Sequence, residues 1–223
     1  LSNSGEQSMV EAKIKTGTTT VGIVCKEGII LAADKRATGG GIPLRVLNKD
    51  VLKVIKITDN IAVTTAGNVS DIQLVVKLIR AETTLKRIRT LKEPSVKEVA
   101  NLLGTILYQN IRQFSTIISI TAFLLGGYDK AGHHLYELSP DGAVMEIADY
   151  MADGSGSEIA MAVLDSLYKK DTNINEGVKL AVKAISASIQ RDTASGEGID
   201  VFTVTKDGVK QVFTRKIDTT ITV

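Results

Sequence analysis

Strand patterns and helix patterns follow one another in pairs along this chain, and this order limits its possible folds more than any other feature. Alternating or β-branched apolar runs mark strands, and apolar residues at i, i+3 and i+4 mark helices. They predict two strand pairs, a helix pair, a strand pair, a second helix pair and a final strand pair. A doubly wound parallel sheet requires alternation of strand and helix instead. The order therefore predicts an α+β fold of two stacked antiparallel sheets, each covered by a helix pair, which is a four-layer α-β-β-α sandwich.

The predicted strands are short apolar runs separated by turn residues. The turn Lys26-Glu27-Gly28 indicates a hairpin near the start of the chain, and Lys206-Asp207-Gly208 indicates one near its end. The expected strands are 18–25, 29–34, 51–57, 61–65, 117–125, 135–138, 143–150, 199–205 and 209–214.

Four helices are predicted from helical spacing. The first begins at Ser70 or Asp71, and the second follows the capping box in Ser95-Val96-Lys97-Glu98. The other two are expected at 158–169 and 175–190. The residues expected to face the core are Leu74, Val75, Leu78, Ile79, Leu85 and Ile88 in the first helix, and Val99, Leu102, Leu103, Ile106 and Ile111 in the second.

The composition bounds the class of protein. The 223 residues include 27 basic and 25 acidic side chains, and no basic cluster indicates nucleic-acid binding. The longest apolar stretch, 114–125, is too short to span a bilayer, and residues 1–17 lack the apolar segment of a secretory signal. One cysteine, Cys25, cannot form an internal disulfide, which fits a reducing compartment. We expect a cytoplasmic globular protein with no nucleic-acid or membrane partner.

Only the N-terminal segment differs in composition from the rest of the chain. Residues 1–17 begin with a polar stretch, so we expect them to form a leader and residues 18–223 to form one domain. Met9 offers an alternative natural start, in which case residues 1–8 are not native.

Several reactive residue types indicate no chemistry of their own. His133 and His134 are adjacent in or beside a strand, so at most one of them can face a serine in a Ser-His-Asp arrangement. Cys25 lies near the end of a strand run, where a lone cysteine usually packs as a small hydrophobe. The sequence has no paired Cys and His spacing, and the glycines at 39–41 match no phosphate-binding loop. We therefore expect neither a metal nor a cofactor.

The segment Gly17-Thr18-Thr19-Thr20 has two interpretations. Threonine favours strands, so the run can simply open a strand. Alternatively, cleavage after Gly17 makes Thr18 a new N-terminus, whose α-amine has a pKa of about 8 and lies beside its own hydroxyl. A threonine hydroxyl is a weak nucleophile that requires an adjacent base of this kind.

A family resemblance favours the second interpretation. Residues 18–24 and 28–38 resemble the opening of a proteasome β subunit of the archaeal type. Similar segments follow in the family's order at Lys53 with Ile55 and Ile57, Thr65-Ala66-Gly67, Gly126-Gly127-Tyr128-Asp129, Gly154-Ser155-Gly156-Ser157, Ala184-Ile185 and Arg191-Asp192-Thr193-Ala194-Ser195-Gly196. The resemblance extends from Gly17 to about Val204. It implies an N-terminal nucleophile hydrolase fold, which is the sandwich predicted above.

The resemblance implies a role for each matching residue. Thr18 becomes the nucleophile of a threonine endopeptidase, and Gly17 the residue before the cleaved bond. Asp34 and Lys53 match a carboxylate–ammonium pair, whose positive charge favours proton loss from the nearby hydroxyl and amine. Gly67 matches the residue whose backbone N–H faces the developing oxyanion. The group that holds the terminal amine is matched by Ser155, Asp192 and Ser195.

One segment departs from the family's pattern. Residues 39–50 form a longer connection than usual, so counting forward by the family's spacing leads to Asp50. Counting back from Gly67 leads to Lys53, which the surrounding apolar alternation supports. Lys49 is the alternative lysine. The same register implies an uncharged substrate pocket lined by Ala37, Thr38, Val51, Ile55, Thr65, Val69 and Gln73. We expect such a pocket to favour apolar residues before the cleaved bond.

The resemblance also implies an assembly. The family acts in stacked seven-membered rings, in which identical or paralogous β subunits are flanked by α subunits, and an unfoldase ATPase supplies unfolded polypeptides indirectly. Activation implies autocleavage between Gly17 and Thr18 during assembly. Two alternatives remain: a non-catalytic β subunit that only builds the ring, and another amidohydrolase of the same fold. The segments at Gly154 and Arg191 count against the second alternative.

Overall fold

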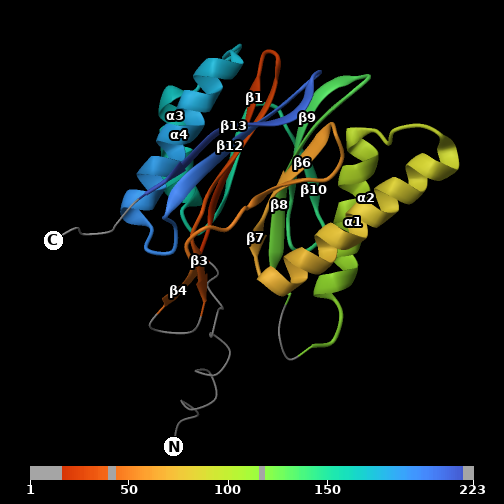
Figure 1. Cartoon of the computed structure of the whole chain (residues 1–223), viewed down its shortest axis with the longest axis horizontal. Coiled ribbons are helices and arrows are strands. Elements are labelled where there is room, and N and C mark those ends of the chain that lie inside the picture. Colours follow the sequence, from red (N-terminus) through yellow and green to blue (C-terminus); the bar gives the residue numbers. More distant parts are fainter. Residues whose placement is uncertain (1–16, 40–43, 116–118, 218–223) are drawn as a thin grey trace, which may run out of the picture.

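Two antiparallel sheets lie face to face, and a helix pair covers the outer side of each (Figure 1). This computed structural model describes residues 17–39, 44–115 and 119–217. The predicted α+β fold, a four-layer α-β-β-α sandwich, is confirmed. Of the predicted leader at 1–17, only Gly17 lies within the described residues.

The first sheet has five strands in the order β11-β1-β2-β12-β13. Its central strand, β2, is buried on both faces: Ile30 and Ala32 pack toward the helices, whereas Ile29 and Leu31 pack between the sheets. Burial on both sides explains why the sequence of β2 is continuously apolar. The bounds of the strands are β1 (Thr19–Cys25), β2 (Gly28–Asp34), β11 (Tyr150–Gly154), β12 (Gly198–Thr205) and β13 (Gly208–Lys216).

The second sheet has the order β10-β9-β8-β6-β5, and the short strand β7 also pairs with β8. A separate two-stranded sheet is formed by β3 and β4. The bounds are β3 (Ala37–Gly39), β4 (Arg45–Asn48), β5 (Val54–Lys56), β6 (Ile61–Thr64), β7 (Ala66–Gly67), β8 (Thr121–Asp129), β9 (Gly132–Leu138) and β10 (Val144–Ile147).

Each helix pair covers one sheet. Helices α1 (Val69–Thr90) and α2 (Val96–Ile111) pack on the second sheet, and α3 (Ser157–Leu167) and α4 (Ile174–Arg191) pack on the first. The predicted capping box is present at the start of α2, because the Ser95 side chain accepts the Glu98 N–H and the Glu98 carboxylate accepts the Ser95 N–H. No helix within the described ranges is long and apolar enough to cross a membrane.

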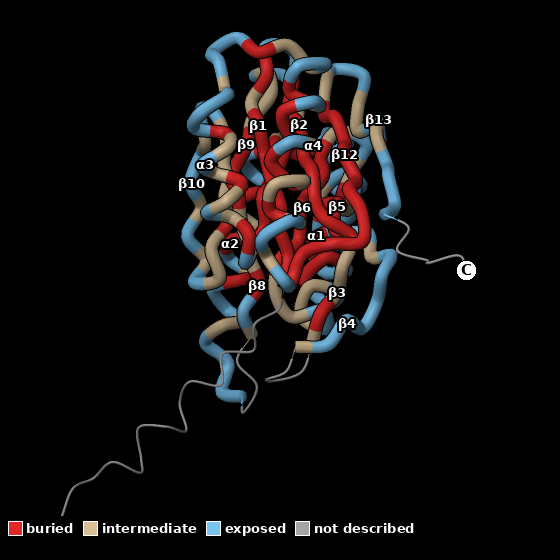
Figure 2. Tube along the Cα trace, turned by 90° about the vertical axis from the view of Figure 1, so that its left-hand side faces the viewer, coloured by how far each residue is buried: buried red, intermediate tan, exposed pale blue. Residues whose placement is uncertain are grey.

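Three clusters of buried apolar side chains fill the three spaces between the layers, and they form the buried centre of the chain in Figure 2. One cluster joins α1 and α2 to the second sheet, another joins α3 and α4 to the first, and the third lies between the two sheets. Burial of apolar surface on both faces of each sheet is the main force that holds the four layers together.

The orientation predicted for the first helix is only partly correct. Val75 and Ile79 are buried, but the other residues expected inward, Leu74, Leu78, Leu85 and Ile88, are exposed. The buried face of α1 consists of Val75, Val76, Ile79 and Thr83. Successive helix residues are about 100° apart, so these two sets of residues lie on adjacent stripes along the surface of α1. The sheet covers only one of them.

Several predicted strand bounds are also corrected. The run at 143–150 is not one strand but two, because β10 belongs to the second sheet and β11 to the first. The strand expected at 51–57 is limited to β5, and the strand expected at 117–125 becomes β8, which starts later and extends to Asp129. Residues 117 and 118 lie outside the described part of the chain.

Candidate active site

Thr18 lies immediately before β1 and is almost completely buried, with 5% of its surface exposed. Its Oγ1 donates a hydrogen bond to the Gly17 carbonyl oxygen at 2.6 Å. The Lys53 Nζ donates to the same Oγ1 at 3.0 Å and reaches the Gly17 oxygen at 3.3 Å. One ammonium therefore contacts both the Thr18 hydroxyl and the carbonyl of the bond that precedes it.

Gly17 is packed so closely that no larger residue fits. A Cβ added at this position would lie 1.9 Å from the Cβ of Ala194. The Gly17 N–H donates to the Thr38 Oγ1 at 3.0 Å, which ties this residue to β3. The Gly17–Thr18 peptide bond is thus held between β3 and the loop that joins α4 to β12.

Asp34 ends β2 and holds Lys53 in place. Its Oδ1 accepts from the Lys53 Nζ at 2.7 Å and from the Thr19 N–H at 3.0 Å. Its Oδ2 accepts the backbone N–H groups of Arg36, at 3.1 Å, and Gly196, at 2.9 Å. Four donors therefore saturate a fully buried carboxylate and fix its orientation.

Burial and Asp34 act in opposite directions on the pKa of Lys53. Burial, the largest influence, lowers the pKa of this ammonium below the ordinary value of lysine, and the charge of Asp34 opposes the shift. A cation that lies 3.0 Å from a hydroxyl oxygen stabilises the deprotonated form of that hydroxyl. The pair can therefore increase the nucleophilicity of Thr18.

A second chain of hydrogen bonds reaches the Thr18 nitrogen. The Thr18 N–H donates to the Ser155 Oγ at 3.2 Å, and that hydroxyl donates to the Asp192 Oδ2 at 2.5 Å. The Ser195 hydroxyl donates to the same carboxylate oxygen at 2.6 Å, so Thr19 is the donor in its 2.7 Å contact with Ser195. The three polar residues expected around this nitrogen are brought together, with Thr19 as an additional member.

The predicted lysine is the one that contacts Thr18. Lys53 lies directly before β5 with 4% of its surface exposed, whereas the alternative, Lys49, is exposed. The Lys53 carbonyl accepts the Thr65 N–H at 2.9 Å, which fixes the segment against the chain just before β7.

Gly67 lies on β7 in a conformation that only glycine adopts readily. Its φ is +125°, and an added Cβ would lie 2.1 Å from the Ile120 carbonyl oxygen. The residues predicted to line the substrate pocket differ in burial. Thr38 and Thr65 are buried, Ala37, Val51 and Ile55 are half-buried, and Val69 and Gln73 are exposed.

Some groups of the site could not be recognised in the sequence, because they belong to the backbone and not to a side chain. The backbone N–H groups of Thr19, Arg36 and Gly196 bind Asp34. Arg36 also donates to the Thr193 carbonyl at 2.9 Å and to the Glu197 Oε1 at 3.1 Å, and so holds the α4–β12 loop. Arg36 could have been identified, because it lies in the segment 28–38 that resembles the family. The backbone donors could not, because nearly every residue has a backbone N–H group.

The residues to which no chemistry was assigned lie elsewhere. Cys25 is buried beneath α4, and burial, followed by the charge of Glu27, raises its pKa to about 12. His134 lies on β9, and its Nδ1 is 2.8 Å from the Glu146 Oε1. Neither belongs to the Thr18 cluster.

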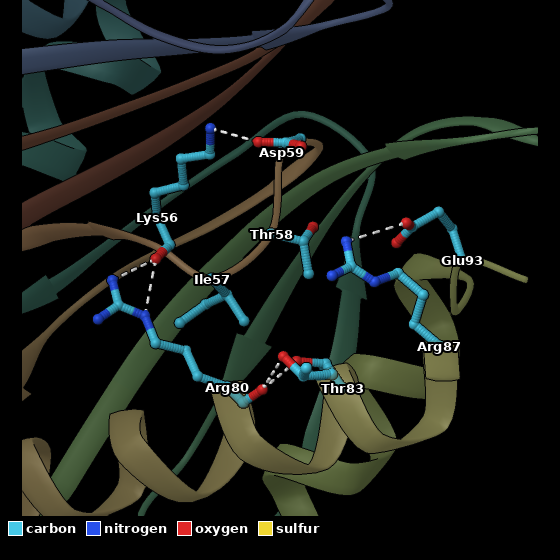
Figure 3. A pocket seen from close by; sticks show the side chains of 9 residues that line it. Lys56, Ile57, Thr58, Asp59, Arg80, Thr83, Arg87 and Glu93 are labelled. Atoms are coloured by element: carbon cyan, nitrogen blue, oxygen red, sulfur yellow. Dashed lines mark hydrogen bonds and ion pairs between the residues drawn. The ribbon is translucent and has the colours of Figure 1, made fainter. Parts of the chain in front are cut away.

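A cavity of about 340 Å³ lies between the β5–β6 turn and α1 (Figure 3). Its charged groups are already paired. The Lys56 Nζ binds the Asp59 Oδ1 at 2.7 Å, Arg87 binds Glu93, and the Arg80 guanidinium binds the Lys56 carbonyl. None of its lining residues belongs to the Thr18 cluster, which remains the candidate active site.

Comparison with known proteins gives a consistent result. Residues 14–204 match the family model described as a proteasome subunit. A "Proteasome subunit beta" from Ferroglobus placidus is 45% identical over 198 residues, which cover 89% of this chain and 91% of that protein. The "Proteasome subunit beta" of Archaeoglobus fulgidus is 39% identical over 95% of this chain and 96% of its own length. The "Proteasome subunit beta 1" of Thermococcus onnurineus is 45% identical over 91% and 95%.

Proposed function

The chain belongs to the proteasome family and is similar throughout to its archaeal β subunits, and from this premise we propose that it is a catalytic β subunit, a threonine endopeptidase. One observation carries the proposal: the Lys53 Nζ, paired with buried Asp34, lies 3.0 Å from the Thr18 Oγ1. A subunit that only builds the ring has no use for a buried ammonium beside a buried hydroxyl, because burial of charge is costly.

The proposed reaction begins with release of the leader. While Gly17 is attached, the Thr18 nitrogen is an amide and has no basic lone pair. The Thr18 Oγ attacks the Gly17 carbonyl carbon, the C–N bond breaks, and an ester and a free amine result. Water then hydrolyses the ester. The contact of the Lys53 Nζ with the Gly17 oxygen at 3.3 Å supports this step, because a nearby cation polarises the carbonyl.

Peptide cleavage uses the amine that this step releases. The α-amine of Thr18 takes the hydroxyl proton, the Thr18 Oγ attacks a substrate carbonyl, and the Gly67 N–H stabilises the oxyanion. The amine delivers its proton to the leaving nitrogen, and water hydrolyses the acyl ester. Ser155, Asp192 and Ser195 orient the amine, since the Ser155 Oγ already lies 3.2 Å from the Thr18 nitrogen.

We further propose that the chain acts in proteasome rings together with α subunits, as its family does. Seven-membered rings, identical or paralogous β neighbours and an unfoldase ATPase that supplies polypeptides indirectly belong to this proposal. So do a cytoplasmic location and the division of the chain into a leader at 1–17 and a domain at 18–223.

Co-assembly with an archaeal-type α subunit tests the function. We expect intact-mass measurement to show loss of all residues before Thr18. A covalent inhibitor that reacts with a hydroxyl and an adjacent amine should then add one mass to the peptide that begins with Thr18. A particle that assembles but keeps the leader and takes up no inhibitor points to the ring-building alternative. Rapid hydrolysis of small amides without peptide cleavage points to another amidohydrolase.

The pocket residues predict substrate preference. None of Ala37, Val51 and Ile55 is charged, and Thr38 and Thr65 are buried. We therefore expect kcat/KM to be about tenfold or more higher for peptides with Leu or Tyr before the cleaved bond than for those with Arg or Glu, because an unpaired charge would be desolvated. A panel of fluorogenic peptides measures this ratio. Faster cleavage after Arg or Glu would contradict the assigned pocket.

A further inference from the structure

The segment that carries Lys53 has no regular structure of its own. Residues 49–53 lie between β4 and β5, and residues 49, 50 and 52 are exposed. Lys53 nevertheless holds its ammonium 3.0 Å from the Thr18 Oγ1. Its carbonyl is fixed by the Thr65 N–H, which acts from the C-terminal side of the segment. A second anchor acts from the N-terminal side of the segment.

That anchor is Lys35, the residue that follows Asp34. The Val51 N–H donates to the Lys35 carbonyl at 3.0 Å. The Lys35 Nζ lies 3.2 Å from the Asp50 Oδ1, three residues before Lys53. The Lys35 N–H binds the Gly196 carbonyl at 3.1 Å. One residue thus connects the strand that carries Asp34, the segment that carries Lys53 and the α4–β12 loop.

A buried carboxylate holds the Lys35 side chain in turn. The Lys35 Nζ lies 2.6 Å from the Asp200 Oδ2, and the two side chains are 6% and 1% exposed. The Asp200 Oδ1 accepts from Gln211 and Thr214 on β13 at 3.1 and 2.6 Å. Lys216, also on β13, pairs with the Asp50 Oδ2. Two cations and two carboxylates form a neutral network that joins the residue after β2, the segment between β4 and β5, β12 and β13.

The charges of Lys35 and Asp50 are maintained by their neighbours. Burial alone lowers the pKa of Lys35, but hydrogen bonds and charges from Asp200 and Asp50 outweigh it and raise the pKa above its ordinary value. Hydrogen bonds from Lys216 and Lys35 lower the pKa of Asp50. Lys35 and Asp50 are therefore both ionised at neutral pH.

We propose that Asp50, held by Lys35, Asp200 and Lys216, is a positioning residue that fixes the Lys53 ammonium at the Thr18 hydroxyl. The inference rests on the proposed function. It assigns a role to Asp50, which joins the segment that carries Lys53 to Lys35, the residue directly after β2. The ion pair acts on the reaction only through the placement of Lys53.

The variant Asp50→Asn tests this role in the particle assembled with α subunits. It keeps the size of a half-exposed side chain and removes only its charge. Lys35→Met is less informative, because it leaves the buried Asp200 carboxylate without its cationic partner. We expect Asp50→Asn to lower kcat about threefold to tenfold with KM within about twofold, since small misplacements of reacting groups are costly. The inactivation rate by the threonine-directed inhibitor should fall in parallel, and Asp50→Glu should restore part of both rates.

Asp59→Asn is the matched control. Asp59 also pairs with a lysine, at 2.7 Å, and lies in the turn just after β5 (Figure 3). Its loss should leave kcat unchanged. A merely structural role for Asp50 predicts a lower unfolding temperature with an unchanged kcat, and this result would overturn the proposal while the endopeptidase assignment stands. A wild-type particle that neither cleaves peptides nor takes up the inhibitor would overturn the proposed function and this inference with it.

Discussion

Thr18→Ala is expected to reduce peptide turnover by the assembled particle about a thousandfold or more, because it removes the attacking oxygen and not merely its activation. The same variant should retain its leader, since attack on the Gly17 carbonyl also needs the Thr18 Oγ. The fold should tolerate the change, because the two lost hydrogen bonds, which the hydroxyl donates to Gly17 and accepts from Lys53, lie in the candidate site and not in the apolar core. Fluorogenic peptide assays and intact mass on the same preparation measure both effects.

The run of three threonines supplies its own control. Thr20 lies on β1 two residues further on and is also buried, but its Oγ1 makes only a 3.5 Å contact with the Asp153 carbonyl. Thr20→Val keeps the shape of the side chain and should leave leader release and turnover nearly unchanged. Equal activity of the Thr18→Ala particle and the wild type would refute the assignment of Thr18 as the nucleophile.

The layers of the fold could be predicted because each apolar run has a periodicity that matches one kind of element. The exceptions are cases where local pattern does not decide. Helix α1 carries two apolar stripes, and only the sheet beneath it determines that Val75 is buried and Leu74 is exposed. The crossing from β10 to β11 takes place within the apolar run 143–150, with no glycine or proline to mark it.

The candidate site was predictable only in part for a similar reason. The resemblance identified Thr18, Asp34 and Lys53, and the structure brings these three residues into contact. The backbone donors on Asp34 could not be predicted, because the property that matters is where a common N–H group points. The resemblance assigned no role to Asp50 or Lys35, so their pairing could not be predicted from the family's spacing.

Asp34→Asn should have the second largest effect, because four donors converge on the two carboxylate oxygens. An asparagine has one oxygen and one NH₂ group in place of the two carboxylate oxygens. The two donors that bind one of these oxygens in Asp34 would therefore face the NH₂ group, which cannot accept their hydrogen bonds. We expect a loss of about 3–5 kcal/mol in the free energy of unfolding, as is common when one member of a buried ion pair is removed. In particles that still assemble, turnover should fall about a hundredfold to ten-thousandfold.

The pH dependence of the Asp34→Asn particle tests why the turnover falls. Burial already lowers the pKa of Lys53, and Asp34 is the main group that opposes this shift. Without that negative charge the pKa of Lys53 falls further. If the ammonium is the active form, the alkaline limb of the kcat profile must move to lower pH. The unfolded chain keeps the ordinary pKa of lysine. At pH values between the lowered pKa of Lys53 in the folded variant and this ordinary pKa, the unfolded chain therefore binds more protons than the folded chain. The free energy of unfolding of the variant should therefore rise with pH in that interval. Reduced turnover with an unmoved alkaline limb would mean that Asp34 acts by holding the backbone of Thr19 and Gly196, and that the charge of Lys53 is not what activates Thr18.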